Sequence, residues 1–303
     1  MEKTPQLADI EDLLTIRDWL RYATSRFTEA GLVFGHGTET ALDEAAFLIL
    51  TALHLPIDQL EPWLEARLTI SERRRLWEIV TARIETRKPA PYLVGAAWIR
   101  GHRFAVDERV IVPRSYIGEL LDGGLSAVVA DPDGVERVLD LCTGSGCLAV
   151  LMALTFPDAS VDAADISAGA LEVAAKNVSD YGLEDRVTLH RSDLFQGLQG
   201  ATYDLIVSNP PYVTAAAVAA FPPEYAAEPE LAHFGGADGL DLVRRILRDA
   251  PAHLAPGGVL IVEVGMARDL LETEYPDLPF LWLDTEQSDG EVFALSAEAL
   301  TAR

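Results

Sequence analysis

The sequence predicts an α/β protein in which a mostly parallel sheet follows a small helical N-terminal domain. Two observations support this fold class. Apolar residues recur at helical spacing through residues 1–95, and from about residue 116 short apolar runs alternate with helical segments. The chain has 303 residues, enough for two domains. We expect a helical domain over 1–91, a β-hairpin linker over 92–115 and a sheet domain over 116–303.

The N-terminal region contains three expected helices. The second follows Asp43 and stops before Pro56, and the third starts at Thr69 and ends at Pro89. Thr69 and Glu72 have the spacing of a capping box, in which the two side chains bind exposed backbone N–H groups. The first helix has one apolar face, formed by Leu13, Ile16, Leu20, Ala23 and Phe27.

The linker and the sheet domain follow in order. Residues 92–115 contain short extended runs broken by Gly101, which indicates a hairpin. Helices are expected over 147–156, from Ser167 to Asp180, and over 238–254, where Pro256 and the two following glycines close the last one. The strands expected in the sheet span 135–142, 160–165, 187–191, 203–208, 259–264, 280–284 and 291–295.

The charge of the chain is strongly negative. It carries 48 acidic and 24 basic residues, and residues 96–303 hold 33 of the acids and 13 of the bases. Such a surface repels a phosphate backbone and attracts a basic partner, which argues against duplex nucleic acid as the main ligand. The alternative is that the acidity serves only solubility.

Other classes of protein are disfavoured by the pattern. No apolar run reaches the ~18–20 residues that span a bilayer, and residues 1–6 do not resemble the start of a secretory signal, so we expect a cytoplasmic protein. Its two cysteines, Cys142 and Cys147, share one glycine-rich segment and form no disulfide framework. No His or Cys group has metal-ligand spacing, so no metal site is expected.

The first candidate motif is the segment Asp140–Cys147, which joins a strand to a helix. Gly144 and Gly146 let the backbone turn tightly and approach a ligand. The next strand ends at Asp165, 19 residues after Gly146, where an acid can accept both hydroxyls of a ribose. Together with Ala149, the glycines also satisfy a relaxed dinucleotide fingerprint, so an NAD enzyme remains open at this point.

The second motif is Asn209-Pro210-Pro211-Tyr212, directly after an expected strand. The two prolines make the turn stiff. The side-chain carbonyl of Asn209 and the main-chain carbonyl of Pro210 can hold a planar –NH₂ group between them, and Tyr212 can offer an aromatic face. The motif therefore indicates a site that presents an amide or amino nitrogen to an electrophile.

Together these motifs resemble those of class I S-adenosylmethionine (SAM) methyltransferases that modify –NH₂ nitrogens. The resemblance implies a Rossmann-like sheet whose last strand is antiparallel. Three further segments, Pro91-Tyr-Leu, Gly101-x-x-Phe104 and Val112-Pro113-Arg114, resemble the linker of the protein-(glutamine-N5) methyltransferases. In that family a helical domain precedes the catalytic one.

Finer features resemble the branch of that family that acts on large-subunit ribosomal protein L-three. The release-factor branch usually has an acidic residue and Thr-Glu after Pro-Arg, where this chain has Ser115-Tyr-Ile-Gly-Glu119. The segments that carry the resemblance include Gly35-His-Gly-Thr38, Val106-Asp-Glu-Arg-Val110, Glu228-Pro-Glu-Leu231 and Asp238-Gly-Leu-Asp-Leu242.

The resemblance implies SAM as the cofactor and N5-methylglutamine as the product. The implied cofactor-binding residues are Asp140, Thr143, Gly144, Ser145, Gly146, Cys147, Asp165, Ile166, Asp193, Leu194 and Asn209. The implied catalytic residues are Asn209, Pro210 and Tyr212. Substrate binding is expected from Asn209, Pro210, Pro211, Tyr212 and Glu228, although Glu228 could instead be a solvated surface residue.

The expected partner is ribosomal protein L-three, a basic protein, which residues 1–91 would recognise; neither a membrane nor direct nucleic-acid binding is expected. One alternative is a release-factor glutamine methyltransferase. Another is a nucleic-acid amino methyltransferase, which would need a basic cleft. A third is a ribosome-assembly factor that keeps the fold without catalysis.

Overall fold

The computed structural model describes residues 11–302, and these form two compact units. The first unit comprises the chain up to Ala96 together with Phe221–Ala227. The second comprises Ala97–Ala220 and the chain from Glu228 onward. The first ten residues of the expected helical domain lie outside the described part.

The first unit is helical, with α1 (Ile16–Glu29), α2 (Ala41–Ala52), α3 (Ile70–Thr86) and α4 (Ala90–Val94). The capping box of Thr69 and Glu72 is confirmed, and a second one joins Thr15 to Asp18 at the start of α1. Of the expected apolar face of α1, Ile16, Ala23 and Phe27 are buried together with Trp19, whereas Leu20 is partly buried and Leu13 is buried just before the helix. The core of this unit therefore forms where the apolar faces of its helices pack together, as the helical spacing of apolar residues predicted.

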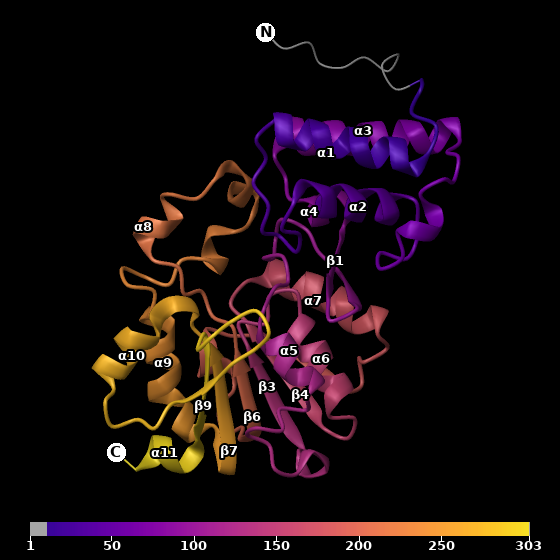
Figure 1. Ribbon diagram of the computed structural model, residues 1–303. Helices are drawn as coiled ribbons and strands as arrows, with labels where there is room; N and C mark the ends of the chain where they lie inside the picture. The colour runs from indigo at the N-terminus through magenta and orange to yellow at the C-terminus, as the bar shows by residue number, and fades with distance from the viewer. Residues whose placement is uncertain (1–10, 303) are drawn as a thin grey trace. The chain divides into compact units, whose positions relative to one another are not determined.

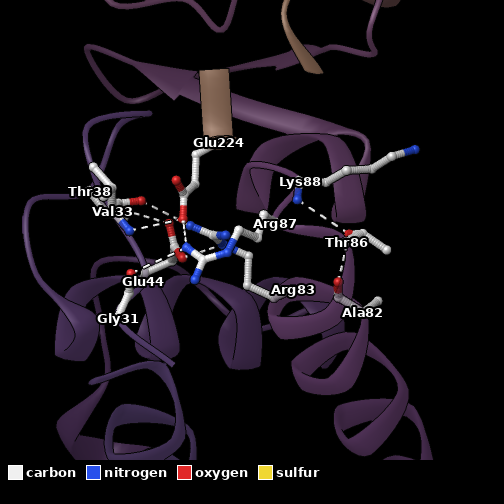
Figure 2. Close-up of polar contacts among 10 residues, drawn as sticks. All are labelled: Gly31, Val33, Thr38, Glu44, Ala82, Arg83, Thr86, Arg87, Lys88 and Glu224. Carbon is white, nitrogen blue, oxygen red and sulfur yellow. Dashed lines mark hydrogen bonds and ion pairs between the residues drawn. The ribbon is translucent and has the colours of Figure 1, made fainter. Parts of the chain in front are cut away.

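Two arginines, one in the last turn of α3 and one directly after it, form ion pairs with buried carboxylates of this unit (Figure 2). Arg83 and Glu44 form an ion pair at 2.6 Å with side chains 0% and 1% exposed. One turn later, Arg87 Nη1 donates to Glu224 Oε1 at 2.6 Å, and the N–H of Val33 donates to the same oxygen at 3.0 Å. Glu224 comes from the short segment 221–227, so this contact fixes that segment to the helical unit.

The second unit contains a sheet and a hairpin, of which only the first residue, Ala96, falls in the first unit. The hairpin is β1 (Ala96–Ile99) and β2 (His102–Ala105). The sheet has the order β5-β4-β3-β6-β7-β9-β8, parallel from β5 to β7, whereas β9 is antiparallel to both of its neighbours. Its strands are β3 (Arg137–Leu141), β4 (Ser160–Asp165), β5 (Val187–Arg191), β6 (Tyr203–Ser208), β7 (Leu254–Glu263), β8 (Leu281–Leu283) and β9 (Val292–Ser296).

Helices cover both faces of this sheet (Figure 1). Alternate residues of β3 illustrate the division, because Val138 joins the core under α5 and α6 while Leu139 joins the core under α9. The helices of this unit are α5 (Ile117–Asp122), α6 (Cys147–Thr155), α7 (Ala168–Asp180), α8 (Ala215–Val218), α9 (Asp241–Asp249), α10 (Arg268–Glu274) and α11 (Ala297–Thr301). The class I methyltransferase architecture implied by the resemblance is thus confirmed.

Most expected elements are found within a few residues of their predicted bounds, and the largest differences lie around residue 250. The helix expected over 238–254 ends at Asp249, because Pro251 shapes a short 3₁₀ turn and β7 already begins at Leu254. Pro256 and the glycines therefore lie inside β7, at an irregularity where the register with β6 shifts. They do not close a helix.

The division between the units also differs from the expected 1–91, 92–115 and 116–303. Ala90 packs in the helical core, so α4 belongs with the first unit. The hairpin belongs with the sheet, since the amide of Asn177 in α7 brackets Ala105: its Oδ1 accepts the N–H at 2.7 Å and its Nδ2 donates to the carbonyl at 3.0 Å. Within residues 11–302, no helix has the length and apolar character needed to cross a bilayer.

Candidate active site

A cavity of about 640 Å³ lies at the carboxyl ends of β3, β4 and β6, within the second unit. This is where the strand order reverses, since β3 has β4 on one side and β6 on the other. Ligands of open α/β sheets bind at such a point, and the size suits a small-molecule site. The predicted residues that line it are Gly144, Asp165, Ile166, Asp193, Leu194, Asn209 and Pro211.

The glycine-rich turn after β3 adopts the conformation that the sequence predicted. Gly144 and Gly146 have φ of 54° and 76°, in the left-handed region. A Cβ at Gly146 would lie 3.0 Å from the Cβ of Ala174, so this glycine also lets α6 begin close to α7. Cys142 has φ of 61°, unusual for a residue other than glycine, and it lines the cavity where the sequence analysis had passed over it.

Asp165 is held rigidly at the end of β4. Its Oδ2 accepts the N–H of Gly144 at 2.9 Å, and its Oδ1 accepts the N–H of Ser167 at 2.8 Å. Asp165 lines the cavity, and a carboxylate has four acceptor positions, so these bonds leave it able to accept from a ligand. Burial raises the pKa of Asp165 despite these bonds. The arrangement suits a carboxylate that accepts hydroxyl groups of a ligand.

Asp140 lies behind the glycine-rich turn and does not line the cavity. Its Oδ2 accepts the hydroxyl of Thr143 at 2.5 Å and the N–H of Ala149 at 3.0 Å. Its Oδ1 is buried with no hydrogen-bond partner among the described residues, and burial raises the pKa of this carboxyl to about 7. Such an atom is costly to leave unpaired and would be satisfied by a cationic group placed at the turn.

Three residues implied for cofactor binding contribute to the turn without lining the cavity. Ser145 accepts the side-chain N–H of Asn177 at 2.8 Å through its carbonyl, which ties the turn to α7. Cys147 is buried at the first position of α6, and burial raises the pKa of its thiol to about 12. Thr143 donates its N–H to the carbonyl of Ala164. These residues shape the turn around the cavity.

Other lining residues combine charged and apolar groups. Asp193 pairs with Arg245 of α9 at 2.8 Å, and both line the cavity. Ile166, Leu231 and Phe234 also line it, with 49%, 58% and 47% of their surfaces exposed. Large apolar side chains that remain this exposed offer a surface for a flat ring.

The Asn209–Tyr212 turn divides into two parts. Asn209 and Pro211 line the cavity, whereas Pro210 is buried and Tyr212 turns away from it. The hydroxyl of Tyr212 donates to Glu263 Oε1 at 3.0 Å, and its ring lies so close to Gly265 that a Cβ there would be 2.8 Å from Cε2. Tyr212 is therefore held by the last residue of β7 and by Gly265 just after it, and it does not line the cavity.

Glu228 is buried, so its interpretation as a solvated surface residue was wrong. Its Oε1 accepts the N–H of Val112 at 2.9 Å, and Arg114 contacts both oxygens at 2.7 and 2.9 Å. His233 Nε2 lies 2.9 Å from Oε2. Glu228 does not line the cavity, and its carboxylate holds the segment around Arg114.

Several lining residues were missed by the sequence analysis. Leu231 and Phe234 lie in an irregular loop with no periodicity, and Arg245 lies on a helix whose orientation only the fold decides. Within residues 11–302, no group of three or more His, Cys, Asp or Glu side chains is arranged to hold a metal ion.

Comparisons with known proteins agree with this geometry. The family model described as "Methyltransferase small domain" matches residues 122–221. A protein of Bradyrhizobium diazoefficiens named ribosomal protein uL3 glutamine methyltransferase is 57% identical, over 98% of this chain and 95% of its own. Its namesake in Bordetella pertussis is 56% identical, over 96% of this chain and 97% of its own. Among solved structures, the hMettl16 catalytic domain in complex with a MAT2A 3′UTR hairpin is 16% identical with a TM-score of 0.50, covering 92% of this chain and 90% of that one. That last likeness concerns the fold alone.

Proposed function

The chain belongs to the family of ribosomal protein uL3 glutamine methyltransferases, and from this premise we propose that it methylates uL3, the large-subunit protein L-three. The reaction moves a methyl group from SAM to the side-chain amide nitrogen of a glutamine and gives N5-methylglutamine. The family and the fold both imply SAM as the methyl donor.

The observation that carries this proposal is that Asp165 and Asn209 line one cavity. They follow β4 and β6, which lie on either side of β3. A carboxylate suited to ribose hydroxyls and an amide oxygen suited to an –NH₂ group thus lie at the same edge of the sheet. A methyl transfer from a nucleoside cofactor to an amide nitrogen needs both groups there.

The residues present fit SAM, which supplies a methyl group on a positively charged sulfur. We expect Asp165 to accept the ribose hydroxyls. The turn made by Thr143, Gly144, Ser145, Gly146 and Cys147 would surround the methionine part.

Asp140 would act from behind this turn. Its Oδ1 has no hydrogen-bond partner among the described residues, and it could accept a hydrogen bond from the ammonium group of SAM. Binding the cofactor would then remove the cost of burying this oxygen without a partner.

The adenine ring requires a flat apolar site with polar groups at its edge. Ile166 and Leu194 line the cavity next to the two acids, and we assign them the faces of the ring. Asp193 lies at the same wall and can accept from the exocyclic amino group, since its pairing with Arg245 leaves lone pairs available.

The chemical difficulty is that an amide nitrogen is a poor nucleophile, because its lone pair is delocalised into the carbonyl. We propose that the side-chain oxygen of Asn209 and the main-chain oxygen of Pro210 accept the two N–H bonds and aim the nitrogen at the methyl group. The gain is orientation and support for positive charge developing on nitrogen. Pro211 would line the substrate path, while Tyr212 and Glu228 would support the site from behind rather than touch the amide.

The substrate partner is expected to be recognised outside this turn. A primary amide is displayed by every glutamine and asparagine, so Asn209 and Pro210 alone cannot select one. We assign recognition to the helical region up to residue 91, acting on a basic protein in the cytoplasm. Direct binding of nucleic acid is not expected, given the net charge of −24.

Mass spectrometry after incubation with SAM tests this proposal. Wild-type enzyme should add one methyl group to one glutamine of purified uL3 and none to release factors. The matched control is Asn209→Ala, which should methylate uL3 about 10²–10³-fold more slowly while still binding SAM. Methylation of release factors in preference to uL3, or of no protein at all, would contradict the proposal.

A further inference from the structure

Glu263 is a buried carboxylate that the proposed chemistry does not use. It is the last residue of β7, only 1% of its surface is exposed, and it does not line the cavity. Burying a charge of this kind is costly unless both oxygens are hydrogen-bonded. A carboxylate kept beside the site at such a cost calls for a physical role.

Three donors converge on it. The hydroxyl of Ser115 donates to Oε2 at 2.6 Å, and the N–H of Tyr116 donates to the same oxygen at 3.0 Å. The hydroxyl of Tyr212 donates to Oε1 at 3.0 Å. Glu263 therefore joins the segment after Arg114 to the turn that carries Asn209.

Tyr212 is enclosed on its other sides as well. Its ring packs against Gly265, where a Cβ would lie 2.8 Å from Cε2. Its Cα lies against Gly235, where a Cβ would come within 2.8 Å of it. The backbone on the other side is held by the bridge between Val213 and Phe234. The hydroxyl bond to Glu263 thus completes the fixing of this residue.

A displacement of Tyr212 would reach the cavity directly. Only two prolines separate Tyr212 from Asn209, and prolines have little freedom to absorb a movement. The orientation of the Asn209 and Pro210 carbonyls therefore depends on where Tyr212 is held.

We propose that Glu263 is a positioning residue for methyl transfer, which fixes the Asn209–Tyr212 turn by accepting the hydroxyls of Tyr212 and Ser115. The role rests on the proposed function, because it concerns the aim of the amide at the methyl group. Glu263 touches neither the amide nor the cofactor and acts through the turn.

The ionisation state of Glu263 supplies a second readout. Burial raises its pKa to about 7, and the nearby charge of Glu291 acts in the same direction. The other titratable groups facing this cluster are Tyr116, Tyr212 and Arg114. The ionised carboxylate accepts from all three donors, whereas the protonated form turns one oxygen into a donor. Turnover should therefore fall as the pH is lowered through about 7.

The experiment measures kcat and KM for uL3, SAM affinity by calorimetry, and the pH profile of kcat. Glu263→Gln and Tyr212→Phe should each lower kcat about 10- to 100-fold, with the SAM dissociation constant unchanged within about 2-fold. The double variant should lose no more than the worse single variant, since both break one unit. In Glu263→Gln, kcat should also no longer fall below pH 7.

Glu291→Gln is the matched control. Glu291 is a neighbouring carboxylate without a hydrogen bond to the turn, so this variant should keep the wild-type kcat.

The outcomes separate this inference from the proposed function. A wild-type enzyme that fails to methylate uL3 contradicts the function itself. An active wild type with a Glu263→Gln variant of equal kcat and pH profile contradicts only the positioning role. If Glu263→Gln does not fold, kcat is measured for Tyr212→Phe and Ser115→Ala instead. A wild-type kcat in both variants would contradict the positioning role of Glu263.

Discussion

The carboxylate of Asp165 is placed by backbone groups rather than by side chains. Two N–H donors at 2.8 and 2.9 Å fix both oxygens, so its direction does not depend on any flexible partner. A charge-assisted hydrogen bond contributes about 1.5–3 kcal/mol. The residue is therefore the main candidate for a polar anchor of the cofactor.

Asp165→Ala should accordingly lower SAM affinity about 10-fold or more. Isothermal calorimetry on the purified protein measures the effect. Asp180→Ala is the matched control, since Asp180 is an exposed carboxylate on α7 whose partner is Lys176. Equal SAM affinity in the Asp165 variant and the control would remove the ribose contact.

Asn209→Ala should leave SAM binding intact and lower kcat about 10²–10³-fold, because only one of the two amide acceptors remains. Single-turnover rates at saturating SAM and uL3 measure this loss. A change confined to KM, with kcat retained, would mean that Asn209 binds the substrate without orienting it.

The side chains that the sequence could predict at this site are those at strand ends. Asp165 and Asn209 each follow an apolar run, and parallel strands bring such positions to one edge. The contacts that hold the Tyr212 ring could not be predicted, because one partner, Glu263 at the end of β7, is 51 residues away in sequence and the other, Gly265, follows it. Local chemistry cannot reveal such a partner.

Among the elements, α3 is both a packing helix and a polar scaffold. Leu76 and Val80 face the core. Arg83, in the last turn of α3, and Arg87, the left-handed residue that ends the helix, each pair with a buried carboxylate. Removing one partner of a buried ion pair leaves the other charge uncompensated, at a cost of about 3–5 kcal/mol.

Arg87→Ala should therefore destabilise the protein by about 3 kcal/mol, because the Glu224 side chain is fully buried and would lose its charged partner. Denaturant unfolding followed by circular dichroism measures the change. Arg74→Ala, at an exposed position of the same helix, is the control and should change stability little. A loss below about 1 kcal/mol for Arg87→Ala would show that water replaces the lost partner.

The helices and strands themselves were largely predictable, since their apolar periodicity is a local property. The capping box at Thr69 located the start of α3 to the residue. The segment 221–227 could not be assigned to the helical unit, because Glu224 meets Arg87 only after folding brings together residues 137 apart in sequence. The β7 start was missed for a related reason: Pro256 and two glycines read as a stop signal, but a register shift accommodates them.

At the scale of the whole molecule, charge is the dominant surface property. The net charge is −24, and most of the excess lies in residues 96–303. A field of this sign raises the encounter rate with a basic protein and lowers it with nucleic acid.

Methylation of uL3 should therefore slow as salt rises from about 50 to 200 mM, since the Debye length falls from about 14 to about 7 Å over that range. The measurement is kcat/KM against ionic strength. The SAM dissociation constant, followed in parallel, should change much less and serves as the control. A flat kcat/KM profile would mean that encounter does not depend on steering.

The segment Phe221–Ala227 makes the helical unit discontinuous in sequence, because the chain enters it again after most of the sheet has been traversed. Recombination between two relatives at a single junction would therefore transfer only part of this unit. In a chimaera joined near residue 96, Arg87 would come from one parent and the residue at position 224 from the other. The helices up to Ala96 and the segment 221–227 should accordingly be inherited together, and a graft of a new recognition domain must include both pieces.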